Sequence, residues 1–165
     1  MTDQKRSAEK DGFARRSFLA LIAAATLGAA ARPAVAAESV IKVHKDPNCG
    51  CCSGWVQHLR DAGFTVQVDD ASDLPGVRKR LGVPADLAAC HTAEVDGYVL
   101  EGHVPAPAVR RLLTERPKAL GLAVPGMPVG SPGMEGGHPQ PYAVVQFGPA
   151  GRTTFMRFVG KEAVG

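Results

Sequence analysis

The chain has 165 residues, of which 45% are hydrophobic and 21% are charged, and its formal net charge is +3. This length predicts one domain, and the composition excludes an intrinsically disordered chain. Residues 1–36 hold six of the 19 basic and three of the 16 acidic residues. The rest of the chain therefore carries 13 basic and 13 acidic residues and has no net charge. We therefore expect no nucleic-acid partner, because such proteins carry a basic surface.

Residues 1–36 have the pattern of an export signal. A pair of arginines, Arg15 and Arg16, precedes an alanine-rich apolar run, and the run ends in small residues at Ala36. The run falls short of the about 20 apolar residues of a membrane-spanning helix. We expect a twin-arginine signal peptide that is cleaved after Ala36, which leaves residues 37–165 as a periplasmic domain with no membrane association. An uncleaved N-terminal anchor is the alternative.

The next strand and helix place the cysteine cluster. The run VIKVHK (residues 40–45) predicts a buried strand. Apolar residues at helical spacing from Trp55 onward predict a helix that ends at Gly63. The stretch between them, HKDPNCGCCSGW, therefore lies on a strand-to-helix turn, with Cys51 and Cys52 in the first helical turn.

A second strand and helix follow. The run FTVQV (residues 64–68) alternates as a strand, and Ser72 or Asp73 can cap a helix that ends at Gly82. The two strands and the helix between them form a βαβ unit, in which the strands should be parallel.

The second half of the chain differs in its pattern. Asp96 and Gly97 stand between two strand-like runs, which predicts a β-hairpin. Pro105 and Pro107 fit the first turn of a helix that Pro117 ends. This order of elements predicts an α/β, thioredoxin-like fold, in which reactive cysteines belong on the first strand-to-helix turn. The runs YAVVQF and TTFMRFV predict a C-terminal hairpin.

A stretch rich in glycine and proline separates these parts. Residues 121–141 contain six glycines and five prolines, which predicts a long irregular loop of functional importance. The loop carries two soft sulfur donors, Met127 and Met134, and also His138. Either methionine can equally serve as packing.

The four cysteines, Cys49, Cys51, Cys52 and Cys90, allow three interpretations: disulfides, a redox pair or metal ligands. An oxidising compartment favours pairing, but clean bridge geometry is available mainly to Cys49 with Cys52, or to one of the cluster with Cys90. Cys49 and Cys52 also have the C-x-x-C spacing of a redox dithiol at a helix N-terminus, where thiolates are stabilised. Redox chemistry does not require Cys51, whereas a metal site gains a ligand from it.

Soft donors select Cu(I) or zinc among the common ions. A structural zinc site could use three cysteines and His91, but zinc sites usually draw ligands from two separated pairs. The adjacent Cys51 and Cys52 suit bridging between several ions better. We therefore expect a copper site, with Met127 and Met134 as further soft donors, and zinc or silver as other metals that it could bind.

Three stretches resemble a known family: KDPNCGCCSGWVQHLRDAGF, GVPADLAACHTAEVDGYVLEGHVPA and GLAVPGMPVGSPGME. The chain resembles the exported domain family, long described as of unknown function, that includes the CopG-type copper resistance proteins. The resemblance covers roughly residues 40–160. It implies a thioredoxin-like fold, a periplasmic place in copper or silver tolerance, and a cysteine-bridged multi-copper site with redox activity. By position, it also implies that the four cysteines are the thiolate ligands, and its motifs match His91, Met127 and Met134 as further metal ligands.

The remaining singled-out residues have more ordinary interpretations. His103 is expected more often to be structural or exposed than to be a ligand. His44 and His58 are expected at the surface or next to the site, and His138 could bind metal opportunistically. Trp55 is expected in the core, where it could also shield the site from water.

Three hypotheses for the function follow. The first is a periplasmic copper-binding protein that contributes to copper tolerance through a multinuclear Cu(I) site, by sequestration or by copper redox conversion. Its partners would be metal ions and other periplasmic copper-handling proteins. The alternative is a thiol-disulfide oxidoreductase that uses Cys49 and Cys52, with Cys90 as a resolving thiol. A zinc-stabilised domain is a third interpretation, and it would unfold on chelation.

Overall fold

A computed structural model describes residues 39–165, so the expected signal segment lies outside the described residues. The described residues form eight strands, three α-helices and one short 3-10 helix. In chain order they are β1 (Val40–Lys45), α1 (Gly50–Asp61), β2 (Thr65–Asp70), α2 (Leu74–Leu81), η1 (Ala85–Leu87), β3 (His91–Val95), β4 (Tyr98–Gly102), α3 (Ala106–Glu115), β5 (Gly121–Val124), β6 (Pro141–Gly148), β7 (Gly151–Val159) and β8 (Glu162–Ala163).

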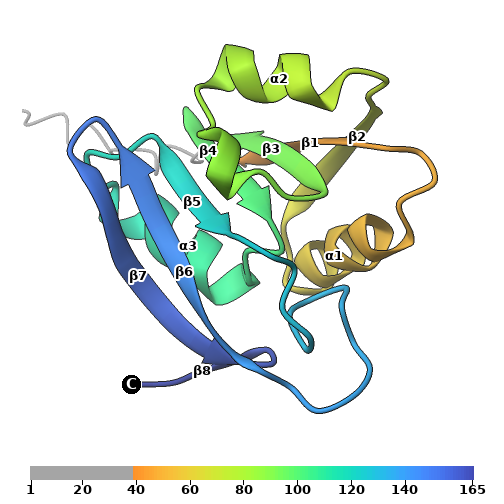
Figure 1. The fold of residues 1–165 in the computed structure, drawn as a ribbon, viewed down its shortest axis with the longest axis vertical. Helices are drawn as coiled ribbons and strands as arrows, with labels where there is room; N and C mark the ends of the chain where they lie inside the picture. The colour runs from red at the N-terminus through yellow and green to blue at the C-terminus, as the bar shows by residue number, and fades with distance from the viewer. Residues whose placement is uncertain (1–38) are drawn as a thin grey trace, which may run out of the picture. The chain divides into compact units, whose positions relative to one another are not determined.

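All eight strands form one mixed sheet in the order β2-β1-β3-β4-β5-β6-β7-β8. Strand β1 pairs parallel with β2 and antiparallel with β3, and β3 pairs antiparallel with β4. The predicted parallel βαβ unit and the predicted hairpin at Asp96-Gly97 are therefore confirmed. The α/β class is confirmed as well, and the β2-β1-β3-β4 core is compatible with the expected thioredoxin-like arrangement (Figure 1).

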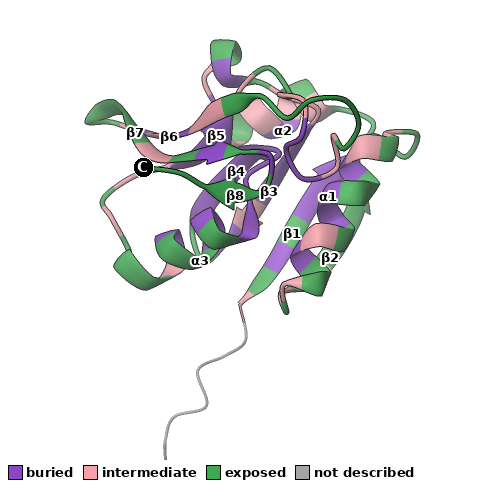
Figure 2. Cartoon of the chain, turned by 90° about the horizontal axis from the view of Figure 1, so that it is seen from below, coloured by how far each residue is buried: buried purple, intermediate pink, exposed green. Residues whose placement is uncertain are grey.

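Helices cover both faces of this sheet. Trp55, Val56 and Leu59 of α1 and Leu112 of α3 pack in one apolar cluster with residues of the central strands such as Leu100. A smaller cluster lies on the other face, beneath α2 and η1, and it contains Val83, Leu87, Val99, Ala123 and Phe147. Figure 2 shows the buried residues concentrated on the central strands and on the helix surfaces that contact them. Trp55 is fully buried, as the sequence predicts.

Local signals in the sequence set the bounds of the helices. The Asp73 side chain accepts a hydrogen bond from Gly76 N at the start of α2, and Gly82 ends the helix in the left-handed conformation with a φ of 71°. Helix α3 begins after Pro105 and ends at Glu115, two residues before Pro117. None of the helices within residues 39–165 has the length and apolar character needed to cross a membrane.

The expected irregular loop begins later than predicted. Residues 121–124 form the buried strand β5, which pairs parallel with β4 and antiparallel with β6. A run of four residues is too short to show a strand pattern in the sequence, and only its place between two longer strands makes it regular. Strand β8, a two-residue addition to β7, was not predicted for the same reason.

His44 is not a surface residue. Its side chain is 3% exposed, and its two ring nitrogens contact Asp69 Oδ2 at 3.0 Å and Glu94 Oε1 at 2.8 Å. These carboxylates come from the neighbouring strands β2 and β3, so their convergence on His44 depends on strand register. The sheet face beneath α2 therefore carries a layer of charged residues beside its small apolar cluster.

Candidate metal centre

The cysteine turn begins where β1 ends and is held by short-range hydrogen bonds. Lys45 Nζ donates to the carbonyls of Asp46 and Pro47 at 3.0 Å and 3.3 Å. The Asp46 side chain accepts from Asn48 N at 2.7 Å, and its carbonyl accepts from Cys49 N at 3.0 Å. Cys49 is the N-cap residue of α1 and makes no side-chain capping bond, so its sulfur remains available for other contacts.

Four sulfur atoms gather at the N-terminus of α1. Cys49 and Cys52 form a disulfide, which is the bridge that the spacing favoured within the cluster. Cys51 and Cys90 are free thiols, and their sulfur atoms lie 3.9 Å apart. Cys51 Sγ also lies 3.5 Å from Cys49 Sγ. All four sulfurs lie within 4.8 Å of one another, so the fold brings Cys90 to the cluster as the sequence predicted.

A second group of donors shares Cys90 with the first. The Cys90 sulfur lies 3.3 Å from His91 Nδ1 and 3.0 Å from His103 Nε2. His103 Nδ1 contacts the Pro132 carbonyl at 2.6 Å, and a carbonyl oxygen can only accept. Nδ1 therefore carries the proton, and the lone pair of the neutral ring is on Nε2, which faces the cysteines. His103 thus joins the candidate site, although its sequence context gave it little weight.

His91 is buried between two rings. Its ring centroid lies 4.2 Å from that of Trp55 and 5.1 Å from that of His103, and its side chain is inaccessible to solvent. His91 Nε2 has no hydrogen-bond partner among the described residues. Burial and the neighbouring His103 keep the pKa of His91 well below its ordinary value. Burial likewise lowers the pKa of His103. Both rings are therefore neutral, which is the form that binds metal ions.

Burial and a neighbouring thiol keep Cys90 protonated in the absence of a metal ion. Burial and the adjacent Cys51 raise the pKa of Cys90 to about 12. A thiolate at this position therefore lacks compensating positive charge. A metal ion bound at Cys90 would supply that charge and displace the thiol proton, so metal binding there would be coupled to proton release.

The long loop reaches the cysteine turn through its backbone. Gly133 Cα packs so closely on α1 that a Cβ atom there would lie 2.7 Å from Trp55 N and would also overlap the Cys51 carbonyl. Its neighbour Pro132 holds His103. Figure 1 shows the segment between β5 and β6 running beside α1. The predicted functional loop therefore covers one side of the site.

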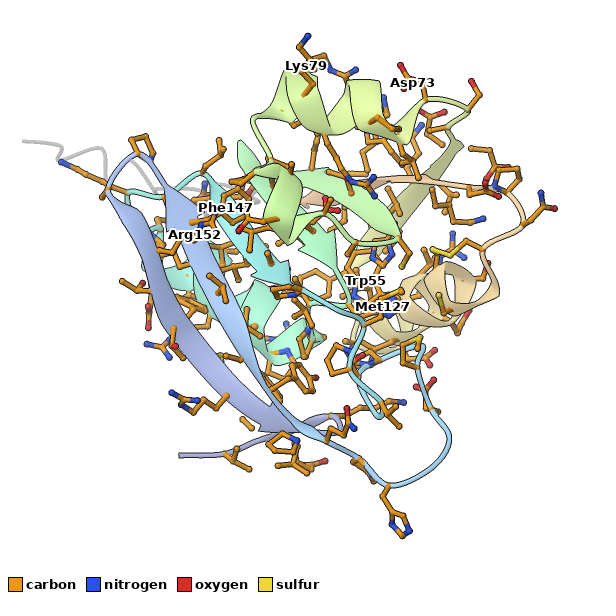
Figure 3. All side chains as sticks on the ribbon, in the orientation of Figure 1. Trp55, Asp73, Lys79, Met127, Phe147 and Arg152 are labelled. Atoms are coloured by element: carbon orange, nitrogen blue, oxygen red, sulfur yellow. A yellow bond between two sulfur atoms is a disulfide. The ribbon has the colours of Figure 1, made fainter. Side chains whose placement is uncertain are left out.

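The two loop methionines differ in their exposure to solvent. Met127, labelled in Figure 3 on the segment between β5 and β6, is 39% exposed and has a φ of 47°. Met134 is half-buried, and its backbone makes turn hydrogen bonds with Gly130 and Ser131. No hydrogen bond among the described residues involves either sulfur. Their role as ligands stays a prediction, as does that of exposed His138.

The buried histidines predict a pH dependence of stability. In the unfolded chain His91 takes up a proton near its ordinary pKa of 6.5, whereas in the folded chain its lowered pKa keeps it neutral. Below that pH the unfolded state binds more protons. We therefore expect the free energy of unfolding to be highest above about pH 6.5 and to decrease as the pH falls below it. Urea unfolding of metal-free protein between about pH 5 and 8 measures this decrease. A His91→Phe variant should show a shallower decrease, and an unchanged slope would contradict this assignment.

Comparisons with known proteins place this site in a family. The family model described as a protein of unknown function, DUF411, matches residues 87–134, which include Cys90, His91 and His103. No curated protein matches the chain.

Two solved structures are similar over most of the chain. They are Form 1 and Form 2 of a copper resistance protein, CopG. Each is 46% identical, with a TM-score of 0.69, over 73% of this chain and 98% of that chain. A cysteine cluster, the resemblance in sequence and this likeness in structure agree: the chain belongs to the CopG-type copper resistance family.

Proposed function

We propose that this protein binds copper as Cu(I) through the thiolates of Cys49, Cys51, Cys52 and Cys90, and so contributes to copper tolerance. The observation that supports this proposal is the convergence of four sulfur atoms within 4.8 Å, one of which also contacts His103. Soft thiolates select Cu(I), and neutral imidazole also suits copper. The same donors could hold zinc or silver, so the preferred metal is part of the proposal.

Each part of the site has a distinct task in holding the ion. The N-terminus of α1 stabilises negative charge on the cysteine sulfurs. Trp55 and His91 exclude water from the inner side, because both side chains are fully buried. The Pro132 carbonyl keeps the Nε2 lone pair of His103 directed at Cys90. Copper itself supplies one-electron chemistry between Cu(I) and Cu(II), which would allow redox conversion at this site.

The disulfide and the complete thiolate site exclude each other. Closing the Cys49–Cys52 bond removes two electrons and two protons from the pair, so neither sulfur then remains a thiolate ligand. A multinuclear Cu(I) site therefore requires the reduced pair. The described structure corresponds to the oxidised form.

Copper loading tests the proposal. The reduced protein is purified anaerobically, loaded with Cu(I), desalted and measured by elemental analysis. We expect about one copper ion or more per chain, and a clear loss in Cys51→Ser, because Cys51 lies between Cys49 and Cys90. Ser53→Ala is the control, since Ser53 is an exposed neighbour in the same turn. Less than one copper per chain, or equal loading in Cys51→Ser, would refute the proposal.

One observation favours a second candidate, a thiol-disulfide oxidoreductase. The Cys49–Cys52 disulfide lies at a helix N-terminus, and a free thiol, Cys51, is 3.5 Å from Cys49 Sγ. Half-buried Cys49 is open to attack, whereas Cys52 is fully buried. This candidate predicts catalysed disulfide exchange in metal-free protein. Exchange no faster than that of a simple dithiol would exclude it.

We further propose a periplasmic location. The support is the twin-arginine pattern at Arg15 and Arg16 and membership in a copper resistance family. The signal would occupy residues 1–36 and the metal-binding domain residues 37–165. N-terminal sequencing of protein from the periplasmic fraction should begin at Ala37. Recovery of the uncleaved chain only in the membrane fraction would instead show an anchor.

A further inference from the structure

Helix α2 contributes none of the candidate ligands, yet one of its side chains reaches the interior beside the metal centre. Arg78 Nε donates to Glu101 Oε1 at 2.8 Å, and the two side chains are 15% and 0% exposed. Glu101 lies on β4 and belongs to the sheet face beneath α2, opposite the face that carries His91 and Trp55. The pair is therefore a buried ion pair behind the site.

The pair binds both polar backbone groups of Ala89, the residue before Cys90. Ala89 N donates to Glu101 Oε1 at 2.6 Å. Arg78 donates to the Ala89 carbonyl, which belongs to the peptide bond that leads into Cys90. On the other side of the cysteine, Thr92 Oγ1 donates to Glu101 Oε2 at 2.6 Å. One carboxylate therefore holds the chain before and after the Cys90-His91 dipeptide.

The same carboxylate lies two residues before His103. Gly102 separates them, with a φ of 71°, and a Cβ atom there would lie 2.7 Å from Ala89 Cβ. The segment that carries His103 thus packs directly on the segment that carries Cys90. Across this contact Cys90 Sγ and His103 Nε2 lie 3.0 Å apart.

Stability alone does not account for a charged pair at this position. Replacing a buried ion pair by apolar residues of similar volume is often neutral or stabilising, because desolvation of the charges offsets their attraction. An apolar pair, however, could not hold both the N–H and the carbonyl of Ala89. The Arg78–Glu101 pair instead fixes the backbone of Ala89, immediately before Cys90.

We propose that Arg78 and Glu101 are positioning residues of the copper site, which fix Cys90 against His103 through the backbone of Ala89. This inference rests on the proposed copper-binding function. It assigns a role in metal affinity to a helix that contributes no candidate ligand. Outer hydrogen-bond partners of metal ligands typically change metal affinity by about 10- to 100-fold.

A double-mutant cycle on the reduced full chain tests the proposal. Cu(I) affinity is measured by competition with a chelator for wild type, Arg78→Ala, Cys90→Ser and the double variant. We expect Arg78→Ala to weaken Cu(I) binding about tenfold or more in the wild-type background. In the Cys90→Ser background the same change should have no further effect, because Arg78 acts through Cys90. Arg111→Ala is the matched control, since it breaks the exposed Arg111–Glu115 pair.

The conservative variant separates geometry from charge. Glu101→Gln keeps an oxygen that can accept from Ala89 N and Arg78, and its amide can donate to Thr92, whereas Glu101→Ala keeps neither. We therefore expect Glu101→Gln to retain tighter Cu(I) binding than Glu101→Ala. If Arg78→Ala does not fold, Arg78→Lys takes its place in the cycle, because it keeps the charge but cannot hold both Glu101 and the Ala89 carbonyl in the same fork geometry.

The outcomes are distinct. Unchanged Cu(I) affinity in the folded arginine variant overturns the positioning role. An equal loss of Cu(I) affinity in the wild-type and Cys90→Ser backgrounds also overturns the positioning role, because it shows that Arg78→Ala acts through a general loss of stability. Failure of the wild-type protein to bind Cu(I) refutes the proposed function itself, so the wild-type arm tells the two failures apart.

Discussion

Oxidising the Cys49–Cys52 pair before metal is added is expected to lower the Cu(I) capacity of the protein by about half or more, because two of the four thiolates are lost as ligands. The remaining free thiols are Cys51 and Cys90, with His103 beside Cys90. The measurement is copper content of the protein after loading, once with the pair reduced and once with the pair oxidised, with free thiols counted in both samples.

A variant that cannot form the disulfide provides the control. In Cys49→Ser the oxidant has no Cys49–Cys52 pair to close, so treated protein that still counts three free thiols should bind as much copper as untreated protein. Equal copper capacity of the oxidised and reduced wild-type protein would show that Cys49 and Cys52 are not ligands. That result would favour the oxidoreductase hypothesis, in which the pair serves redox exchange alone.

Replacing Gly133 by alanine is expected to destabilise the fold and to weaken copper binding together. Gly133 has a φ of 87°, and a Cβ atom there would meet the backbone of α1, 2.7 Å from Trp55 N. Left-handed backbone and overpacking together predict a loss of about 3 kcal/mol in the free energy of unfolding. To avoid the overlap between the new Cβ atom and α1, the loop must move away from the helix. This movement breaks the contact between the Pro132 carbonyl and His103 Nδ1. Urea unfolding and Cu(I) competition measure the two effects.

Gly137 offers a matched control on the same loop. Its φ is 76°, but the nearest atom to a Cβ there is Val129 Cγ1 at 3.6 Å, an ordinary contact. Gly137→Ala should therefore lower the free energy of unfolding by only about 1 to 2 kcal/mol, which is the backbone strain. Its copper affinity should be unchanged. If Gly133→Ala behaves no differently from Gly137→Ala, the close contact between loop and helix is not important for the site.

Local sequence signals predicted the first half of the fold well. The strand at residues 40–45, the Asp73 cap and the Gly82 stop of α2 all agree with the structure. The hairpin at Asp96-Gly97 agrees too. Each of these depends on neighbouring residues, through side-chain alternation, capping hydrogen bonds or positive φ angles. Such features are encoded within a few residues, so the sequence alone reveals them.

Features that depend on strand register were less accessible. Strand β5 was expected to be part of the irregular loop, and His44 was expected at the surface or next to the site. Both are buried because strands distant in the sequence lie next to them: β4 and β6 beside β5, and β2 and β3 beside His44. No short stretch of sequence contains that information. The EGH context of His103 likewise favoured a structural or exposed side chain over a ligand, whereas its Nε2 lies 3.0 Å from Cys90 Sγ.

The stretch HKDPNCGCCSGW by itself determined that three thiols lie on a strand-to-helix turn, because strand and helix patterns on either side fix the local geometry. The sequence favoured a copper site over a disulfide or a redox pair, but it did not reveal which donors of the rest of the fold face the turn. Tertiary structure brings Cys90, His91 and His103 to it from β3 and the end of β4, and the Pro132-Gly133 segment from the loop. These contacts join residues far apart in the chain, and the tertiary packing of sheet, helix and loop determines which of them meet.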